Sequence, residues 1–199
     1  MALTTYSDLQ TSVANWLAKD NLTSIIPDLI VLGEKRLFRT LRVREMETAL
    51  SGTIASGVVA VPASYLDLKF AYIDGTPVQN LGKASASQIY AKYPLRASDS
   101  CPSVIGREGT NFIFGPFPDS AYTVKGIYYA KPTSVVTSPT FFAEYPDAFL
   151  FASLCEASAY IHNDPRIAVW ETKLAQVIGA INDQAKQEDA GAGMAVRAA

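Results

Sequence analysis

Apolar residues near the N-terminus recur at the three- and four-residue spacing of an amphipathic helix. Thr5 followed by Asp8 matches a capping box, in which each side chain bonds the other residue's backbone amide. We therefore expect a helix from Tyr6 to about Lys19, with one apolar face made by Leu9, Val13, Trp16 and Leu17.

Pro27 and Asp28 predict the start of a second helix, because proline is tolerated in a first turn and an acid complements the positive end of the helix dipole. At about 100° per residue, three basic side chains then lie almost opposite the apolar stripe. The pattern predicts one face for packing, made by Ile30, Gly33, Leu37 and Leu41. It also predicts a ridge of positive charge, made by Lys35, Arg39 and Arg42.

From Ser51 the pattern changes to the alternation typical of strands. The turn signal Ser56-Gly57 within residues 53–62 predicts two short strands or a bulged hairpin. In the next segment polar and small residues alternate with apolar ones, so one strand face is expected to carry Leu66, Leu68, Phe70 and Tyr72. Two further strands are expected at residues 111–114 and 122–129, with a short helix at residues 85–93.

Helical spacing returns after Pro146-Asp147, where a broad face of apolar and small residues is typical of a central bundle helix. Asn163-Asp164-Pro165 ends that helix and starts another, so the two are expected to form a helical hairpin. After Asp189 the sequence AGAGMAVRAA is small and apolar, and we expect a flexible tail there.

These elements predict an α+β fold, in which a helical bundle from the N- and C-terminal helices carries an inserted antiparallel β module. The expected divisions are residues 1–50 for the N-terminal helices and 51–143 for the β module. Residues 144–188 are expected to form the C-terminal helical hairpin of the bundle, and residues 189–199 the flexible tail.

The composition is that of a globular chain, 49% hydrophobic and 18% charged over 199 residues. No secretory signal is visible in MALTTYSDLQ, and no apolar run approaches the roughly 20 residues of a membrane helix. We expect no membrane partner and a cytoplasm-like compartment of synthesis. In such a reducing compartment, Cys101 and Cys155 are interpreted as buried thiols in preference to a disulfide.

Charge is unevenly spread along the chain. Residues 1–50 hold six basic and six acidic residues, whereas residues 143–199 hold four basic and eight acidic ones. The formal net charge of −2 argues against a protein that binds nucleic acid over its whole surface.

The basic ridge leaves two interpretations open. One is a solvated helix face, partly neutralised by Glu34, Glu45 and Glu47. The other places a polyanion in front of the ridge. Phosphate contacts gain affinity in proportion to their number, so three charges become effective for this purpose only when many copies repeat them.

Residues suited to catalysis or metal binding are hard to find. The single histidine, His162, stands at the end of the third expected helix, where a cation at the negative end of the dipole explains it. No glycine-flanked serine or cysteine accompanies it, and no histidine cluster suits a transition metal. The spacing of Gly106, Gly109 and Gly115 does not match a phosphate-binding loop. We expect no catalytic residue, no metal site and no cofactor, and so no enzyme.

Four segments carry a family resemblance by their order and spacing. The first is the opening, YSDLQTSVANWLAKDNLTSIIPDLIVLGEKRLFRTLRVREMET. VPASYLDLK, FGPFPDSAYTVKGIYYAKP and EYPDAFLFASLCEASAYIHNDPRIAVWETKL follow it in that order. Over about Tyr6 to Asp183 the chain resembles phage and prophage head-to-tail adaptors, or connectors. Its plan is similar to that of the tail tubular protein A family of short-tailed phages.

This resemblance implies a structural virion protein, made in the host cytoplasm and located in the neck at the head-tail interface. Copies are expected to assemble as a ring, a dodecamer, between the portal protein and a distal tail protein of the nozzle or tube. Double-stranded DNA would pass through the lumen of the ring without sequence-specific binding.

The resemblance also implies roles for particular residues. Lys35, Arg39 and Arg42 would face nucleic acid in the lumen or contact a neighbouring subunit. The tail would dock on the portal through Gly191, Ala192, Gly193, Met194, Ala195, Val196 and Arg197. Contacts with the tail side or between subunits would involve Phe112, Phe114, Tyr122 and Tyr128.

Two other classes of protein stay open from the sequence. A freestanding nucleic-acid-binding module predicts salt-dependent DNA binding by the monomer. A tail-associated wall hydrolase requires a pair of carboxylates in a cleft.

Overall fold

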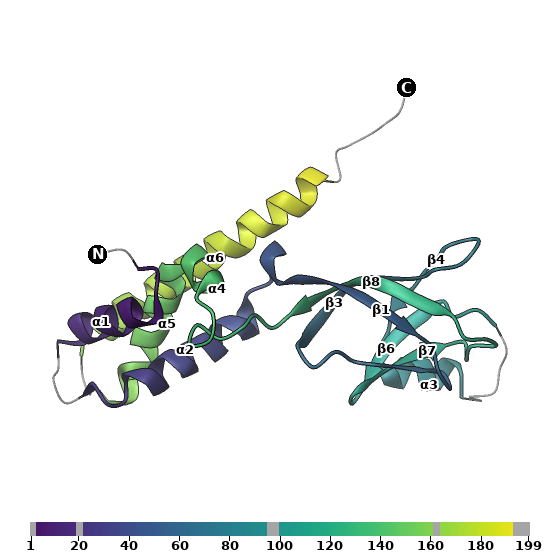
Figure 1. Ribbon diagram of the computed structural model, residues 1–199, viewed down its shortest axis with the longest axis horizontal. Coiled ribbons are helices and arrows are strands. Elements are labelled where there is room, and N and C mark those ends of the chain that lie inside the picture. The colour runs from purple at the N-terminus through teal and green to yellow at the C-terminus, as the bar shows by residue number, and fades with distance from the viewer. Residues whose placement is uncertain (1–2, 19–21, 95–99, 161–163, 193–199) are drawn as a thin grey trace, which may run out of the picture. The chain divides into compact units, whose positions relative to one another are not determined.

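The computed structural model describes residues 3–18, 22–94, 100–160 and 164–192. The chain divides into two compact units: a helical unit of residues 1–45 with 132–199, and a β unit of residues 46–131. Figure 1 traces the chain from N-terminal helices through the strands to the C-terminal helices. The expected α+β fold is confirmed.

The helical unit begins with the predicted capping box, in which the Asp8 amide donates to Thr5 Oγ1 and the Thr5 amide donates to Asp8 Oδ2. Its helices are α1 (Tyr6–Leu17), α2 (Ile26–Thr40), α4 (Thr140–Glu144), α5 (Pro146–Glu156) and α6 (Arg166–Ala192), with a 3-10 turn η3 (Ala157–Ala159) after α5. A second 3-10 turn, η2 (Arg44–Met46), precedes the first strand.

Helix α5 is central in the helical unit, since α1, α2 and α6 all pack against it. Gly33 allows α2 to approach α5 closely, because a Cβ at this position would lie 2.8 Å from the backbone nitrogen of Ser153. The predicted stripes of α1 and α2 are buried, with one exception. Trp16 is 46% exposed and packs edge-on against Phe151.

The β unit contains two four-stranded sheets. The first, named sheet A here, has the order β1-β8-β3-β4 and is built from β1 (Glu47–Thr53), β8 (Thr123–Ala130), β3 (Tyr65–Ile73) and β4 (Gln79–Asn80). Sheet B has the order β2-β7-β6-β5 and is built from β2 (Val58–Ala60), β7 (Asn111–Gly115), β6 (Val104–Glu108) and β5 (Gly82–Lys83). All pairings are antiparallel except that of β5 with β6.

The two sheets share one core, and a helix covers the far side of sheet B. The core between the sheets includes Leu50, Leu68, Val124, Ile105, Phe112 and Phe114. Helix α3 (Ala86–Lys92) lies on the outer side of β6 and β7, where a Cβ on Gly106 would come 2.8 Å from Ile89 Cδ1. The β unit therefore has three layers: sheet A, sheet B and α3 (Figure 1).

A β-bulge in β3 overturns the expected alternation of Leu66, Leu68, Phe70 and Tyr72. Leu68 pairs with Tyr128, but Phe70 pairs with Ile127, so β3 carries one extra residue between the two pairs. Beyond the bulge, Ala71 and Ile73 are buried, whereas Phe70 is 43% exposed. An extra residue reverses the facing of every later residue, because strand side chains alternate with a period of two.

The bulge is possible because β8 has a glycine beside it. A Cβ on Gly126 would collide with the carbonyl oxygen of Phe70 and lie 2.9 Å from Ala71 Cα. Without that Cβ, the displaced backbone of β3 can approach β8 closely.

Of the two alternatives expected around Ser56-Gly57, the structure has two strands, β1 and β2, on either side of the turn. β1 begins at Glu47 rather than near Ser51. All seven of its residues pair with β8, which comes last in the sequence of the β unit. β1 and β2 belong to different sheets, and an antiparallel bridge between Ala55 and Val58 closes the turn that connects them. The predicted turn is present, with positive φ angles of 52° at Ser56 and 78° at Gly57.

Candidate functional site

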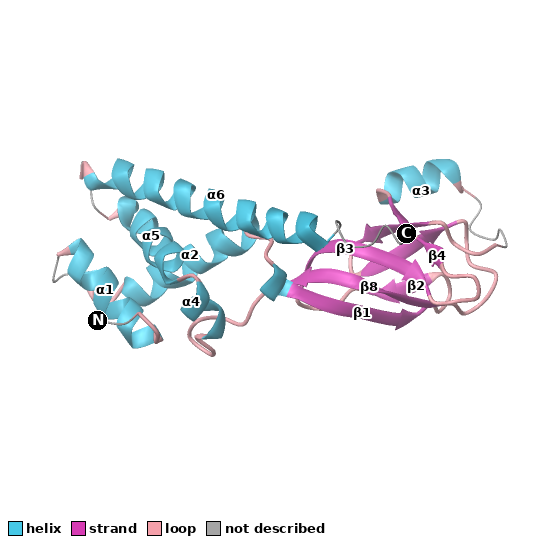
Figure 2. Ribbon diagram, turned by 90° about the horizontal axis from the view of Figure 1, so that it is seen from above, coloured by secondary structure: helices cyan, strands magenta, loops and turns pink. Residues whose placement is uncertain are grey.

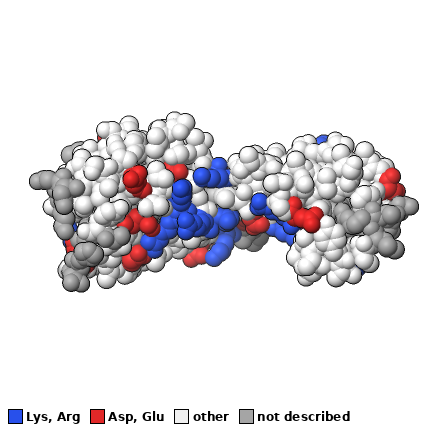
Figure 3. Space-filling model, turned by 90° about the horizontal axis from the view of Figure 1, so that it is seen from below, with Lys and Arg blue, Asp and Glu red and all other residues white. Residues whose placement is uncertain are grey.

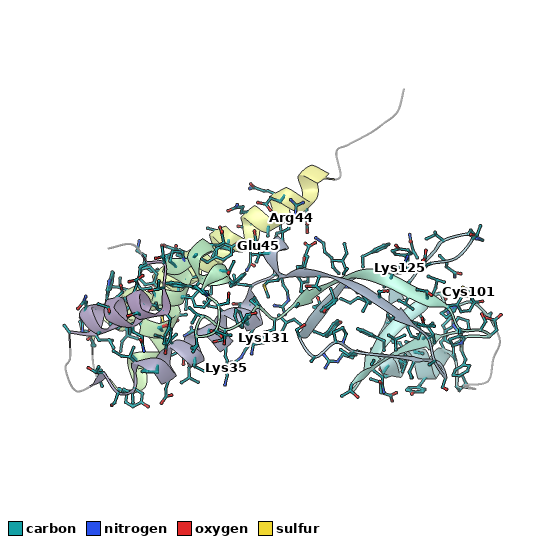
Figure 4. All side chains as sticks on the ribbon, in the orientation of Figure 1. Lys35, Arg44, Glu45, Cys101, Lys125 and Lys131 are labelled. Carbon is teal, nitrogen blue, oxygen red and sulfur yellow. The ribbon has the colours of Figure 1, made fainter. Side chains whose placement is uncertain are left out.

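The basic side of α2 is the candidate site that the sequence singled out. Lys35 and Arg39 are exposed and stand one helical turn apart, while Leu37 between them is fully buried. Figure 4 shows Lys35 on the side of α2 that faces away from α6. In Figure 3, basic side chains gather on one face of the helical unit, with acidic ones beside them.

Arg42 does not belong to this face, which corrects the expected ridge of three. α2 ends at Thr40, and Leu41 already has an extended backbone. The Arg42 guanidinium folds back and donates to the carbonyl oxygens of Phe38 at 3.1 Å and Leu41 at 2.6 Å. It satisfies carbonyl groups at the negative end of the helix, so its charge serves as a cap. The basic face of α2 is therefore Lys35 and Arg39.

Arg36 has a different role from its neighbours. Its guanidinium bonds Glu171 of α6 through two nitrogens, at 3.1 and 2.6 Å, and reaches Glu156 of α5 at 3.4 Å. These bonds, chiefly the one with Glu171, raise the pKa of Arg36. Arg36 thus links three helices of the bundle.

The three acids expected to neutralise the basic face are engaged elsewhere. Glu34 is only 4% exposed, and its carboxylate accepts bonds from Ser134 Oγ and the Val135 amide, both at 2.9 Å. Glu45 accepts from the Tyr145 hydroxyl at 2.9 Å, and Glu47 pairs with Lys69 of the β unit at 2.6 Å. Among the residues that the structure describes, Lys35 and Arg39 have no ion-pair partner. The solvated-face interpretation thus loses the neutralising carboxylates on which it relied.

The expected tail begins later than residue 189. Helix α6 continues to Ala192, so the backbone of Gly191 and Ala192 is helical. The preceding residues include the good helix formers Gln184, Ala185, Lys186, Gln187 and Glu188, which explains the extension. The other residues expected to dock on the portal, 193–197, lie outside the described residues, as does His162.

Three of the four aromatic residues expected to contact partners are packed inside the β unit. Phe112, Phe114 and Tyr128 are 1%, 0% and 6% exposed and belong to the core between the sheets. These three side chains therefore contribute to the core and offer no surface to a partner in this structure. Tyr122 is half-buried, and its hydroxyl donates to Asp119 at 2.6 Å.

Sequence reasoning missed an apolar surface on the outer face of sheet A. Phe70 and Ile127 are paired across β3 and β8 and are 43% and 38% exposed. The isolated glycine in YTVKGIYY was the available signal, because a glycine inside a strand often marks a bulge.

Three further features concern metal ligands, membrane helices and thiols among the described residues. No group of three or more His, Cys, Asp or Glu side chains is placed to hold a metal ion within the described ranges. In the same part of the chain, no helix has the length and apolar character needed to cross a membrane. Both cysteines are free thiols, Cys155 buried and Cys101 half-buried.

Comparison with known proteins identifies one family. The family model described as SU10 adaptor protein matches residues 4–197, which include both units. The match confirms the resemblance to phage head-to-tail adaptors. No curated protein matches the chain.

Proposed function

The chain belongs to the SU10 adaptor protein family, and from this premise we propose that its copies form a ring between the portal protein and the distal tail protein of a phage. The ring continues the DNA channel through the neck of the virion. Its role is structural rather than catalytic.

The match over residues 4–197 is the observation that carries this proposal. It extends across the helical unit and the β unit, so the adaptor role draws on both. The expected roles of the two units are part of the proposal. The C-terminal hairpin and residues 191–197 dock on the portal, and the β unit contacts neighbouring copies or the tail protein.

The basic face of α2 supports a position beside DNA. Lys35 and Arg39 are exposed and form no ion pair with any carboxylate in the described part of the chain. Two charges per copy are too few to bind DNA tightly, but about 24 in a ring of about twelve copies would line a channel with positive potential. Lysine and arginine contacts with phosphate groups do not depend on the base sequence. Such a surface therefore suits DNA of any sequence that passes through the channel.

Electron microscopy tests the proposal directly. Purified protein mixed with its portal should give ring-shaped complexes with the adaptor below the portal. A wild-type mixture without such rings would remove the main support for the adaptor role. Salt-dependent DNA binding by the monomer alone, without rings, would instead support a freestanding nucleic-acid-binding module.

A charge variant separates the channel from the ring. Lys35→Gln with Arg39→Gln should leave rings intact but increase DNA loss from filled heads. The matched control, Lys83→Gln with Lys173→Gln, removes two other exposed lysines and should leave DNA retention unchanged. If the first pair of substitutions abolishes rings, Lys35 and Arg39 belong to a subunit interface.

A further inference from the structure

The outer face of sheet A has an apolar centre. We define this centre as Ala49, Phe70, Tyr72 and Ile127. Ile127 of β8 pairs with Ala49 of β1 on one side and with Phe70 of β3 on the other. The rings of Phe70 and Tyr72 lie 5.8 Å apart, and Phe70 and Ile127 are 43% and 38% exposed. A phenylalanine beside an isoleucine in the middle of a sheet face is an exposed apolar patch rather than a scattered surface residue.

Charged pairs border the apolar centre at both ends. Lys69 meets Glu47 at 2.6 Å at one end, and Lys125 meets Asp74 at 2.6 Å at the other. An apolar centre with a polar rim is the usual anatomy of a protein interface. Because each lysine is already paired with a carboxylate, the face presents no single sign of charge. A protein surface fits it better than a polyanion does.

The two outer sides of the β unit differ in their covering. The outer side of sheet B is covered by α3, which buries Ile89 and Ile113 to 1% exposure each. No described helix of the β unit covers the outer face of sheet A, which Figure 2 shows from above. Among the described residues of the β unit, a helix therefore covers the outer face of sheet B but not that of sheet A.

We propose that the outer face of sheet A packs against the α3 side of the β unit of the next copy of this chain. The inference rests on the proposed ring. A ring is built from two different surfaces on each copy, and with about twelve copies their outward directions differ by about 150°. Sheet A and α3 are the opposite outer layers of one three-layer unit, which comes close to that requirement. The exposed residues of α3, which would receive it, are Ser87, Gln88, Tyr90, Ala91 and Lys92.

The size of the face fits a contact that forms only within a ring. Three strands spaced by about 4.8 Å, with seven paired residues rising about 3.3 Å each, give roughly 300 Å² of projected area. A stable two-protein interface buries about 800 Å² on each partner. A single contact is therefore too small to hold a dimer, and repetition around a closed ring stabilises it.

Photo-crosslinking identifies the occupant of this face. Phe70 is replaced with p-benzoylphenylalanine, an aromatic residue of related shape, and rings are assembled on the portal and checked by electron microscopy. After irradiation, mass spectrometry should find residue 70 of one copy joined to residues 85–93 of another. A crosslink to the portal, to a tail protein or to any other segment, or no crosslink in assembled rings, overturns the proposal.

Charge substitutions give a second, independent test. Phe70→Asp and Ile127→Asp should reduce the number of rings at least tenfold, while the monomer unfolds at the same urea concentration as the wild type. Val136→Asp, at another exposed apolar position in the helical unit, is the matched control and should assemble normally. If the aspartate variants fail to fold, the crosslink decides.

The outcomes separate this inference from the proposed function. A wild-type protein that makes no ring with its portal contradicts the adaptor role itself. Normal rings from wild type, Phe70→Asp and Ile127→Asp contradict only the proposed contact.

Discussion

The helical unit and the β unit present their exposed surfaces for different reasons. On α2, the basic residues Lys35 and Arg39 stand opposite the buried stripe, as a period of 3.6 residues requires. On β3, Phe70 is exposed although the alternation of the sequence places it with Leu68. The helix face follows from hydrogen bonds within one segment, whereas the strand face depends on pairing with a distant strand. The positions of Lys35 and Arg39 could thus be inferred locally, whereas the outward facing of Phe70 could not.

The largest effect is expected where the β unit departs from its sequence pattern. Gly126→Ala places a Cβ against the Phe70 carbonyl and 2.9 Å from Ala71 Cα, so the bulged ladder must shift. We expect a loss of about 3 kcal/mol in the free energy of unfolding, measured in urea. Gly179→Ala is the control, since nothing lies within 4 Å of its Cβ position in α6. An unchanged stability for Gly126→Ala would contradict the role of this glycine in the bulge.

A smaller effect is expected at the close helix contact in the helical unit. Gly33→Ala puts a Cβ 2.8 Å from the Ser153 nitrogen and 2.9 Å from the Ala152 carbonyl carbon, so α2 and α5 must separate slightly. Two helices can move apart as rigid bodies more easily than a paired ladder can slip. We therefore expect about 2 kcal/mol of destabilisation in the same urea measurement. If Gly33→Ala lowered the free energy of unfolding more than Gly126→Ala does, the helix contact would be less able to adjust than the strand ladder, contrary to this expectation.

Arg42 and Arg39 separate capping from surface charge within α2. Arg42→Ala removes two bonds to carbonyl groups at the helix end and is expected to lower the free energy of unfolding by about 1 kcal/mol. Arg39→Ala removes an exposed charge and should change stability by less than about 0.5 kcal/mol. Equal effects in thermal unfolding would place Arg42 back on the basic face.

The smallest effect concerns the two thiols. Burial, followed by the nearby Glu171 carboxylate, raises the pKa of Cys155 from 9.0 to about 12. The folded state therefore favours the neutral thiol, a contribution fully present below pH 9 and lost as the pH rises toward 12. At pH 8 a disulfide reagent should modify Cys101 quickly and Cys155 only after denaturant is added. Rapid modification of both in the folded protein would contradict the buried position of Cys155.

Much of the candidate site was predictable because its signals are local. The capping box of Thr5 and Asp8, the start of α2 and its two faces all follow from spacing within one turn or two. The role of Arg42 was missed because the helix ends two residues earlier, and helix ends are the least certain feature of a periodic pattern. Glu34 was misplaced for another reason. Its partners, Ser134 and Val135, are about a hundred residues away in the sequence, and no local pattern around Glu34 predicts a contact with them.

By itself, the sequence determined that helices at the two ends of the chain enclose a β segment, that α2 has a basic side, and that the order of motifs is that of a phage adaptor family. Tertiary structure alone decided which of the basic residues are available and which apolar residues stay outside. Arg36 and Arg42 bond groups that the fold brings to them, and Phe70 faces outward because Gly126 lets the backbone of β3 bulge. Periodicity is a property of one segment, whereas availability depends on what the rest of the chain places beside each residue.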